Sequence, residues 1–383
     1  MRGTVRGKGP AGMREPAEVR RRRILAVVQS RGSARVSDLA AELEVSVVTV
    51  RRDVEELARR GALRRGHGVV RPVVPVARPA RSAAPYDRGD AVAVVVPERH
   101  AYLNETLHGA RGVLEEAGIR IALHIAPQAD GAERPIVESA LAGGARGLLI
   151  APRWRGADEE DADARWLAET GVPTVLMERR PDRGGPLHAV DSVCSDHWYG
   201  VHLAVEHLVA LGHRRIVLAA RDDSPTARAV RAAFAGIAAA RPEIEDWCVV
   251  LSAPASRSGR GAAAPAPLDL AALLRRRRAT GALLHGDVDA LMLVQQLADA
   301  GVRVPQDCSV VAYDDVVAAL GSVPLTAVAP PKAEVGRAAA ELLLRRLAFE
   351  HGTATVPEAV RRVELLPRLE VRGSAQTPPG DAR

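Results

Sequence analysis

Apolar residues in the first part of the chain recur at helical spacing. In two short segments they fall three or four positions apart and so share one face of a helix: Leu39 and Leu43, then Val47, Val50, Val54 and Leu57. Ser37 and Ser46 stand where a side-chain oxygen can cap each helix, and Gly61 ends the second. The pattern predicts two short helices joined by a turn.

A further helix and a small hairpin are expected on either side of this pair. Pro16 suits the first turn of a helix that runs to Gln29, with Ile24 and Val28 on its inner face. Residues 63–69 alternate in character and contain two glycines, which favours a short basic hairpin, or wing. The pattern therefore predicts a small domain of helices and a wing.

From Asp90 the pattern changes to short apolar strands that alternate with amphipathic helices. Strands are predicted at residues 91–97, 120–125, 147–151, 173–177, 215–220, 248–252, 282–285 and 309–312. Helices are predicted at residues 102–117, 199–211, 226–240, 268–278, 288–300 and 333–348. Such alternation is typical of parallel sheets, and one small sheet cannot hold so many units. We therefore expect an α/β domain of two lobes.

Composition marks the boundaries between these parts. Residues 1–14 and 372–383 are expected to be disordered tails, and four prolines within residues 72–89 indicate a semi-extended linker. The predicted domains are a helical head at residues 15–71 and an α/β domain at residues 90–371. A low-complexity surface loop is expected at residues 253–267 within the second domain.

Positive charge is concentrated on the head. Residues 1–81 carry 19 Lys and Arg against 8 Asp and Glu, a net charge of +11, whereas the rest of the chain has a net charge of −5. A module that binds a polyanion has this asymmetry. The helical spacing also turns four residues outward, near the half of a recognition helix that meets base edges: Val48, Thr49, Arg51 and Arg52.

Few features favour an enzyme, a metalloprotein or a secreted protein. The sequence has no P-loop, no G-x-S-x-G segment and no dinucleotide fingerprint, and the spacing of His202 and His207 separates them across a helix. The three cysteines suggest neither a zinc site nor a disulfide framework. The charged N-terminal residues are not followed by an apolar run, so we expect no signal peptide, and no apolar segment reaches membrane-spanning length. We expect a cytoplasmic protein without catalytic residues, bound metal or cofactor.

Residues 45–54, VSVVTVRRDV, and residues 65–69, RGHGV, resemble the recognition helix and wing of the DeoR-type winged helix-turn-helix. Val69 stands in place of the second glycine of that wing. The resemblance covers residues 15–71 and implies that the head binds duplex DNA. The expected DNA contacts are Ser46, Val48, Thr49, Arg51, Arg52, Arg64, Arg65 and His67.

These residues are expected to contact different parts of DNA. Arginines of the recognition helix suit guanine or phosphate, whereas the wing residues suit phosphate or the minor groove. For Arg51 and Arg52 the alternative is an ion pair with Asp53 or Glu56 on the helix surface. We expect at least one of the two arginines to contact DNA.

Residues 192–218 resemble the middle signature of the effector domain of the lactose-repressor (LacI/GalR) family. The fitting positions are Asp196, Gly200, Ala204, His207, Leu208, Gly212, His213 and Ile216, with His197 in place of the usual asparagine. Agreement extends over residues 90–371 and implies a two-lobed periplasmic-binding-protein fold, a small ligand in the cleft and a homodimer. The family's usual DNA-binding head and hinge helix are absent, and the DeoR-type head and proline-rich linker stand in their place.

Four residues are candidates for effector contact: Tyr102, Asp196, Arg228 and Asp287. Ligands of such domains bind at the carboxyl ends of strands. Tyr102 and Asp287 fall where the family has a ring-stacking aromatic and a hydroxyl-binding aspartate. Asp196 and Asp287 are equally suited to cap the helices that follow them. The family's pocket arginine aligns with Val230, and Arg228 is the better of the two arginines that flank it.

These features together predict a ligand-responsive transcriptional regulator. The expected partners are operator DNA, a small effector such as a sugar or related polar metabolite, and a second copy of the chain. A repressor of carbohydrate or related catabolic genes is the leading interpretation, and an activator of the same architecture is the alternative. A solute-binding protein would share the two-lobed fold but would not carry the head. An isomerase-like enzyme would need a phosphate-binding loop, and none is found.

Overall fold

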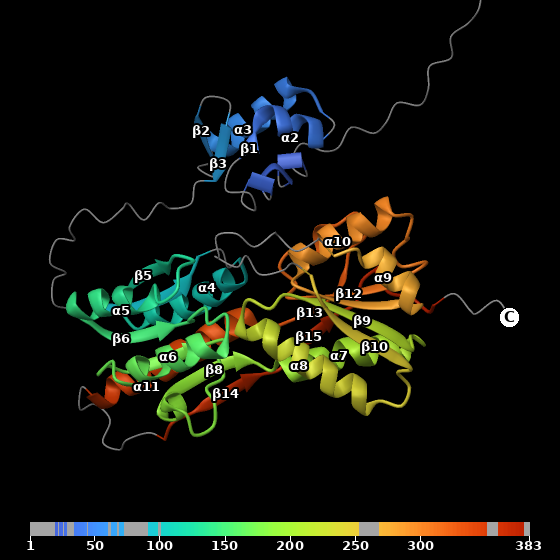
Figure 1. Cartoon of the computed structure of the whole chain (residues 1–383). Coiled ribbons are helices and arrows are strands. Elements are labelled where there is room, and N and C mark those ends of the chain that lie inside the picture. Colours follow the sequence, from blue (N-terminus) through green and yellow to red (C-terminus); the bar gives the residue numbers. More distant parts are fainter. Residues whose placement is uncertain are drawn as a thin grey trace, which may run out of the picture. The chain divides into compact units, whose positions relative to one another are not determined.

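The chain divides into two compact units, residues 1–84 and residues 85–383 (Figure 1). The computed structural model describes residues 20–21, 23–25, 27–28, 34–43, 45–59, 63–66, 69–72, 91–98, 101–252, 268–350 and 359–378. The predicted tail at residues 1–14, the linker beyond Pro72 and the predicted loop at residues 253–267 lie outside the described residues.

The smaller unit packs helices against a three-stranded antiparallel sheet in the order β1-β3-β2. Its elements are β1 (Ala34–Arg35), α2 (Val36–Glu42), α3 (Val47–Arg59), β2 (Leu63–Gly66) and β3 (Val69–Pro72). Their inner faces share one core with helical residues Ile24 and Val28, and this core includes Leu39, Val50 and Leu57. The predicted pair of helices and the wing hairpin are therefore present in the structure.

Of the two predicted helix caps, Ser46 is present in the structure and Ser37 is not. The Thr49 backbone N–H donates to Ser46 Oγ over 3.2 Å, so Ser46 caps α3 as expected. Helix α2 begins at Val36, one residue before Ser37, whose hydroxyl instead donates to Asp38. The predicted capping role of Ser37 is wrong because the helix starts directly after strand β1, which the sequence pattern did not indicate.

The larger unit consists of two lobes, each built around a six-stranded sheet. The first-lobe sheet has the order β14-β8-β7-β6-β4-β5, and all its pairs are parallel. Its strands and helices are β4 (Ala91–Pro97), α4 (Ala101–Glu116), β5 (Arg120–Ala126), α5 (Glu133–Ala142), β6 (Ala145–Ile150), α6 (Ala157–Ala168), β7 (Thr174–Met177), β8 (Asp191–Ser195), α11 (Lys332–Glu350) and β14 (Arg362–Leu365). A 3-10 turn, η1 (Pro186–Ala189), precedes β8.

Close helix contact fixes one face of the first lobe. A Cβ on Gly109 of α4 would lie 1.9 Å from the Ala333 carbonyl oxygen, and one on Gly336 of α11 would lie 1.8 Å from the Thr106 carbonyl oxygen. Because neither space admits a side chain, both positions require glycine. Helices α4 and α11 therefore pack backbone to backbone against the sheet.

The second lobe has the sheet order β10-β9-β11-β12-β13-β15, in which the last pair alone is antiparallel. Its elements are α7 (His197–Ala210), β9 (Arg215–Ala220), α8 (Pro225–Ala240), β10 (Asp246–Leu251), α9 (Leu270–Arg277), β11 (Gly281–His285), α10 (Asp287–Asp299), β12 (Ser309–Tyr313), η2 (Ala318–Leu320), β13 (Thr326–Ala329) and β15 (Arg368–Glu370). Helices cover both faces of each sheet, so central strands such as β11 and β12 are buried throughout. The predicted two-lobed α/β fold is confirmed.

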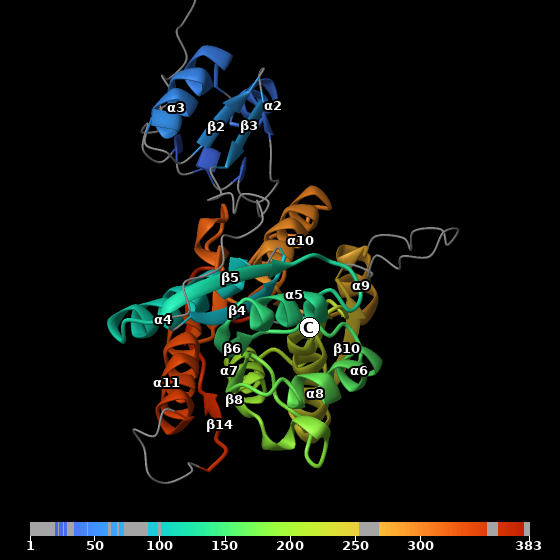
Figure 2. The ribbon, with the colours of Figure 1, turned by 90° about the vertical axis from the view of Figure 1, so that its left-hand side faces the viewer.

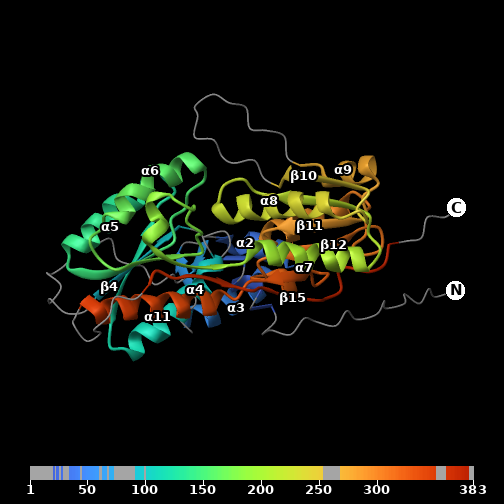
Figure 3. The same ribbon diagram turned by 90° about the horizontal axis from the view of Figure 1, so that it is seen from below.

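Three chain crossings join the lobes, and Figure 3 shows the lobes side by side. The chain passes from β8 to α7, from β13 to α11, and from β14 to β15. The Asp196 backbone N–H donates to the Leu365 carbonyl over 2.9 Å, which ties the first crossing to the third. This set of crossings forms a hinge and leaves the facing strand ends free to line a cleft.

The prediction that residues 372–383 form a disordered tail is wrong for residues 372–378. Ser374 is fully buried, where its hydroxyl donates to the Val310 carbonyl and accepts from the Thr326 backbone N–H. The Gln376 backbone N–H donates to Ser309 Oγ over 3.0 Å. The segment therefore covers one end of the second-lobe sheet, and its polar side chains form hydrogen bonds with backbone groups there.

Among the described residues, no helix is long and apolar enough to cross a membrane.

Candidate DNA-binding helix and ligand cleft

Helix α3 exposes the residues that the sequence assigns to DNA contact. Val48 is 64% exposed, and Arg51 and Arg52 are also exposed, whereas Val50 and Leu57 on the other face are buried. Within the described part of the chain, neither guanidinium group forms a hydrogen bond or an ion pair. The outer face of α3 therefore offers two unpaired guanidinium groups near its N-terminal half.

The acids that were the alternative partners of these arginines are engaged elsewhere. The Asp53 carboxylate, 3% exposed, pairs with Arg20 Nε at 2.6 Å and with Arg21 Nε at 3.0 Å. Glu56 pairs with Arg59 at the far end of α3. These two ion pairs connect α3 to the helical residues Arg20 and Arg21, which come before β1 and α2 in the chain. They therefore help to fix the position of α3 and of its exposed arginines.

The wing is described in its backbone. Arg64 pairs with Arg71 and Arg65 with Val70 across the antiparallel strands β2 and β3. The side chains of Arg64 and Arg65, and the whole of His67, lie outside the described residues. Their DNA contacts stay predictions.

A cavity of about 410 Å³ lies between the two lobes of the larger unit. The first lobe contributes side chains at the ends of β6, β7 and β8 and on α6, and the second lobe contributes the first turns of α7 and α8. Its walls include Trp154, Glu160, Glu178, Arg179, Ser195, His197, Trp198, Thr226 and Arg228. Acidic, basic and aromatic groups therefore face one space, which suits a small polar ligand.

Backbone strain gathers at the strand ends that face this cleft. Trp154, Glu178, Asp314 and Asp315 have φ values of 34°, 53°, 98° and 49°, a region that residues other than glycine rarely adopt. They follow β6, β7 and β12. Such conformations cost of order 1–3 kcal/mol each and cluster at functional sites.

Glu178 is the centre of a hydrogen-bond network in the cleft. The residue is 3% exposed. Its carboxylate accepts hydrogen bonds from the Tyr102 hydroxyl at 2.7 Å and from the Ser195 backbone N–H and hydroxyl, each at 3.0 Å. Burial, and then the negative charge of Glu178, raises the pKa of Tyr102 well above its ordinary value. Tyr102 thus stays a neutral donor, and the Lys332 ammonium lies 5.5 Å from the centre of its ring.

Two buried histidines of the second lobe lie beside this network, His197 with its Nε2 3.9 Å from the Glu178 carboxylate and His285 against the Tyr313 ring. His197 Nδ1 lies 3.2 Å from the Tyr313 hydroxyl, and burial lowers the pKa of His197. Burial, with repulsion from His197 and Arg221, lowers the pKa of His285 to about 3. Neither ring nitrogen of His285 has a hydrogen-bond partner within the described residues. The imidazoles are therefore neutral near pH 7, and His285 keeps unused hydrogen-bonding capacity.

Asp314, directly after β12, carries a carboxyl group whose pKa is strongly shifted. Burial raises its pKa to about 7, and the neighbouring Asp287 adds to this effect while Lys332 opposes it. One oxygen of its carboxyl is buried and has no hydrogen-bond partner in the described part of the chain. The group is therefore poised to change charge near neutral pH.

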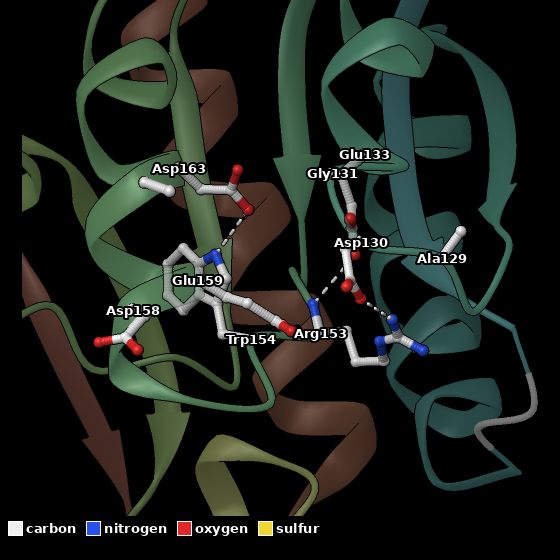
Figure 4. A pocket seen from close by; sticks show the side chains of 10 residues that line it. Ala129, Asp130, Gly131, Glu133, Arg153, Trp154, Asp158, Glu159 and Asp163 are labelled. Carbon is white, nitrogen blue, oxygen red and sulfur yellow. Dashed lines mark hydrogen bonds and ion pairs between the residues drawn. The ribbon is translucent and has the colours of Figure 1, made fainter. Parts of the chain in front are cut away.

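A second cavity, of about 240 Å³, lies within the first lobe between α5 and α6 (Figure 4). Trp154 Nε1 donates to Asp163 at 3.0 Å, and the Arg153 backbone N–H donates to Glu133 at 3.1 Å. These bonds hold the segment between β6 and α6, whose other side faces the cleft. Within the described residues, no group of three or more His, Cys, Asp or Glu side chains is arranged to hold a metal ion.

Comparison with known proteins gives matches for both units. Residues 20–73 match the family described as DeoR-like helix-turn-helix domain, and residues 205–375 match the family described as periplasmic binding protein-like domain. The chain joins a DeoR-like head to a periplasmic-binding-protein-like domain. The resemblances inferred from its sequence are confirmed.

Individual relatives agree with this architecture. The chain is 29% identical over 209 residues to the HTH-type transcriptional repressor PurR of Aliivibrio fischeri, an alignment that covers 52% of this chain and 59% of PurR. It is 33% identical over 223 residues to an uncharacterized HTH-type transcriptional regulator in the aml 5′ region of Streptomyces limosus, with 56% and 58% covered. The chain thus spans about three fifths of the length of the curated relatives it matches.

A solved structure shares the fold of the periplasmic-binding-protein-like domain. A LacI family transcriptional regulator from Enterococcus faecium with bound ribose aligns with a TM-score of 0.58 at 22% identity. The alignment covers 75% of this chain and 99% of the other. At this identity the likeness shows the common fold.

The four predicted effector residues of the periplasmic-binding-protein-like domain have these places. Asp196 caps α7 by accepting from the Tyr199 backbone N–H at 2.9 Å, and Tyr102 donates to Glu178. Arg228 lines the cavity and bonds across it to the first lobe. The fourth, Asp287, is 2% exposed, and its carboxylate accepts from the backbone N–H groups of residues 316–318.

Sequence reasoning missed several residues that line the cavity, Glu178 among them, and it also missed His285, which is buried next to Tyr313. Glu178 and His285 carry no recognisable motif, although each is the polar residue at the end of an apolar strand segment. Ligands bind at the carboxyl ends of parallel strands, so a polar residue at the end of an apolar strand was the only signal in the sequence that could have identified these residues. Glu178 bonds to Tyr102 and Ser195, whereas His285 contacts the Tyr313 ring and makes no side-chain hydrogen bond within the described residues.

Asp287→Ala should destabilise the second lobe rather than merely weaken ligand binding. The substitution leaves one buried and two partly buried backbone N–H groups without an acceptor, and the expected loss is about 2–3 kcal/mol of unfolding free energy. Urea unfolding of the full chain measures it, with Asp299→Asn at the exposed end of α10 as the control. Unchanged unfolding together with lost effector response would instead assign Asp287 to the ligand.

Proposed function

We propose that this chain is a DNA-binding transcriptional regulator that responds to a small ligand, and that it acts as a repressor. The observation that carries the proposal is the exposed face of α3, with Arg51 and Arg52 unpaired, in a head that matches the DeoR-like helix-turn-helix domain. A relative named as a transcriptional repressor supports the direction of the response. The proposal assigns no catalytic activity to the chain.

In this proposal α3 lies in the major groove and the wing follows the backbone. Ser46 holds the first turn of α3, and Thr49, Val48, Arg51 and Arg52 face the base edges. Arginine can donate two parallel hydrogen bonds to guanine, which gives sequence discrimination. Arg64, Arg65 and His67 would contact phosphate and give affinity without discrimination.

DNA affinity should fall steeply with salt. For each phosphate that the head neutralises, the slope of log K against log salt concentration is about −0.9, because binding releases condensed counterions. Arg65→Ala should make the slope shallower by about one phosphate and weaken binding to operator and to random duplex alike. Fluorescence anisotropy titrations at several salt concentrations measure both effects. A slope near zero would contradict electrostatic binding by the head.

The ligand of this regulator would occupy the cavity between the lobes. Glu178 and Ser195 on one lobe and His197 and Arg228 on the other line this cavity and offer donors and acceptors, as a polyhydroxylated molecule requires. A regulator of the same fold was solved with bound ribose, which supports a sugar or related polar metabolite. A thermal-shift screen of sugars, sugar phosphates and nucleosides tests this assignment.

A homodimer is the form of the protein proposed to bind DNA. Among the described residues, strand β5 is one edge of the first-lobe sheet, and its side chains Leu123 and Ile125 are 47% and 51% exposed. Helix α10 exposes Met292 at 56%, and Figures 1 and 2 show β5 and α10 along the same side of this unit. An edge strand with exposed apolar side chains favours association, which would bury both surfaces.

Charged substitutions on this side should separate the dimer. Met292→Glu and Ile125→Glu would each place an unpaired carboxylate in the interface, so the dimer dissociation constant should rise at least tenfold. Leu366→Glu, in the connection between β14 and β15, is a control of similar exposure at 60%. Sedimentation equilibrium measures the three variants. If all remained as dimeric as the parent chain, this side would not be the interface.

A further inference from the structure

One arginine spans the cleft from the second lobe to the first. Arg228 lies in the first turn of α8, where Ser224 accepts from the Ala227 backbone N–H and fixes the start of the helix. Its guanidinium donates through Nη1 to the Trp154 carbonyl at 2.6 Å and through Nη2 to Glu160 at 3.1 Å. Both acceptors belong to the first lobe.

The surroundings make these bonds stronger than those of a surface pair. The side chains of Arg228 and Glu160 are 31% and 18% exposed, so solvent screens them only in part. Trp154 itself is 2% exposed, and its indole is held by Asp163, so its carbonyl is a fixed acceptor. The two bonds thus join α8 to a rigid part of the first lobe.

The position of the pair determines what it can do. The three chain crossings already connect the lobes at the hinge, whereas Arg228 and Glu160 both line the cavity. A bond across the cavity lies away from the hinge and resists its opening. Both bonds join protein groups directly, so they can hold the lobes together without a bridging ligand.

We propose that Arg228, Glu160 and the Trp154 carbonyl form a clamp that holds the two lobes closed over the cavity. A ligand must then fit beneath the clamp or replace one of its bonds, and the clamp sets the balance between open and closed lobes. This inference goes beyond the regulatory function and does not depend on it, because it concerns the lobes themselves.

The cysteines provide a direct test of lobe opening in the full chain. Cys194 is 4% exposed and lines the cavity, whereas Cys308 is 2% exposed and lies in the core of the second lobe. Burial raises the pKa of both thiols to about 12, so both are slow to react in the closed protein. Opening of the lobes would expose Cys194 and leave Cys308 covered.

The experiment measures labelling by N-ethylmaleimide at each cysteine by peptide mass spectrometry, without DNA or ligand. Arg228→Ala removes both bonds and should speed labelling of Cys194 about tenfold, and Glu160→Gln should speed it to a smaller extent. The control Glu206→Gln breaks the pair with Arg241 inside the second lobe and should leave Cys194 unchanged. Cys308 should label at the parent rate throughout.

Two results would overturn the clamp. Cys194 labelling in Arg228→Ala at the parent rate would show that these bonds do not hold the lobes. Equal acceleration at Cys194 and Cys308 would show general loosening of the fold instead of lobe opening. Because neither readout involves DNA or effector, failure of the clamp would leave the proposed regulatory function to its own tests.

Discussion

Replacing Arg51 and Arg52 together by alanine should remove most of the preference of the protein for its operator over random duplex. Each arginine that bonds a guanine in two places contributes about 1–3 kcal/mol of discrimination, so Arg52→Ala alone should cost roughly 5- to 150-fold. The double substitution should cost more, although adjacent residues need not add. Competition titrations with labelled operator and unlabelled random duplex measure the preference.

Arg59→Ala is the matched control for this experiment. Arg59 also lies on α3 and is exposed, but it stands at the C-terminal end and pairs with Glu56. Its loss should leave the operator preference within about twofold, because that end of the helix is far from the proposed base contacts. Equal losses for Arg59→Ala and Arg52→Ala would refute the assignment of the N-terminal half of α3 to base recognition.

Asp53→Asn should strongly destabilise the head while the larger unit keeps its stability. The substitution leaves Arg20 and Arg21 without their shared carboxylate, and breaking a buried ion pair from one side costs about 3–5 kcal/mol. A small domain has a total stability of only about 5–15 kcal/mol, so this loss removes a large part of the stability of the head and unfolds it if the parent value is near the lower end of that range. DNA binding should be lost with it.

Thermal unfolding followed by circular dichroism measures this change. The transition of the head should move to lower temperature or vanish, whereas the transition of the larger unit should stay in place. Asp38→Asn, an exposed acid on α2, is the control and should change the head by about 1 kcal/mol or less. A head transition in Asp53→Asn that matched the parent chain would mean that the buried pairs contribute little.

The strands that were predicted well are those whose signal is local. β4 and β9 coincide with the predicted residues 91–97 and 215–220, because an apolar run between polar turns needs no partner to be recognised. β14 and β15 were missed. They are short, and their burial depends on β8 and β13, strands that lie far away in the sequence.

For the candidate sites too, features that depend on local spacing were predicted and contacts between distant residues were not. Helical spacing alone places Val48, Arg51 and Arg52 on the outer face of α3, and the structure agrees. The partner of Asp53 was not predictable, because Arg20 precedes it by 33 residues and belongs to a run that reads equally well as a solvated helix start.

The carboxylate of Asp287 shows the limit of reasoning from a motif. The sequence places it at a strand end, where either a ligand or a helix cap is a reasonable partner. In the structure its carboxylate oxygen accepts hydrogen bonds from backbone N–H groups of the loop that follows β12, about 30 residues further along the chain. Interactions between elements, rather than within them, are what the sequence alone did not provide.

The central claim is that the head reads DNA through the exposed face of α3. The most direct test incubates the full-length chain with a pool of random-sequence duplexes, recovers the bound fraction and sequences it. The account predicts enrichment of one two-fold symmetric sequence, as a homodimer requires, and loss of that enrichment in Arg52→Ala but not in Arg59→Ala. Recovery of duplexes without any shared sequence, or the same enrichment in Arg52→Ala, would contradict it.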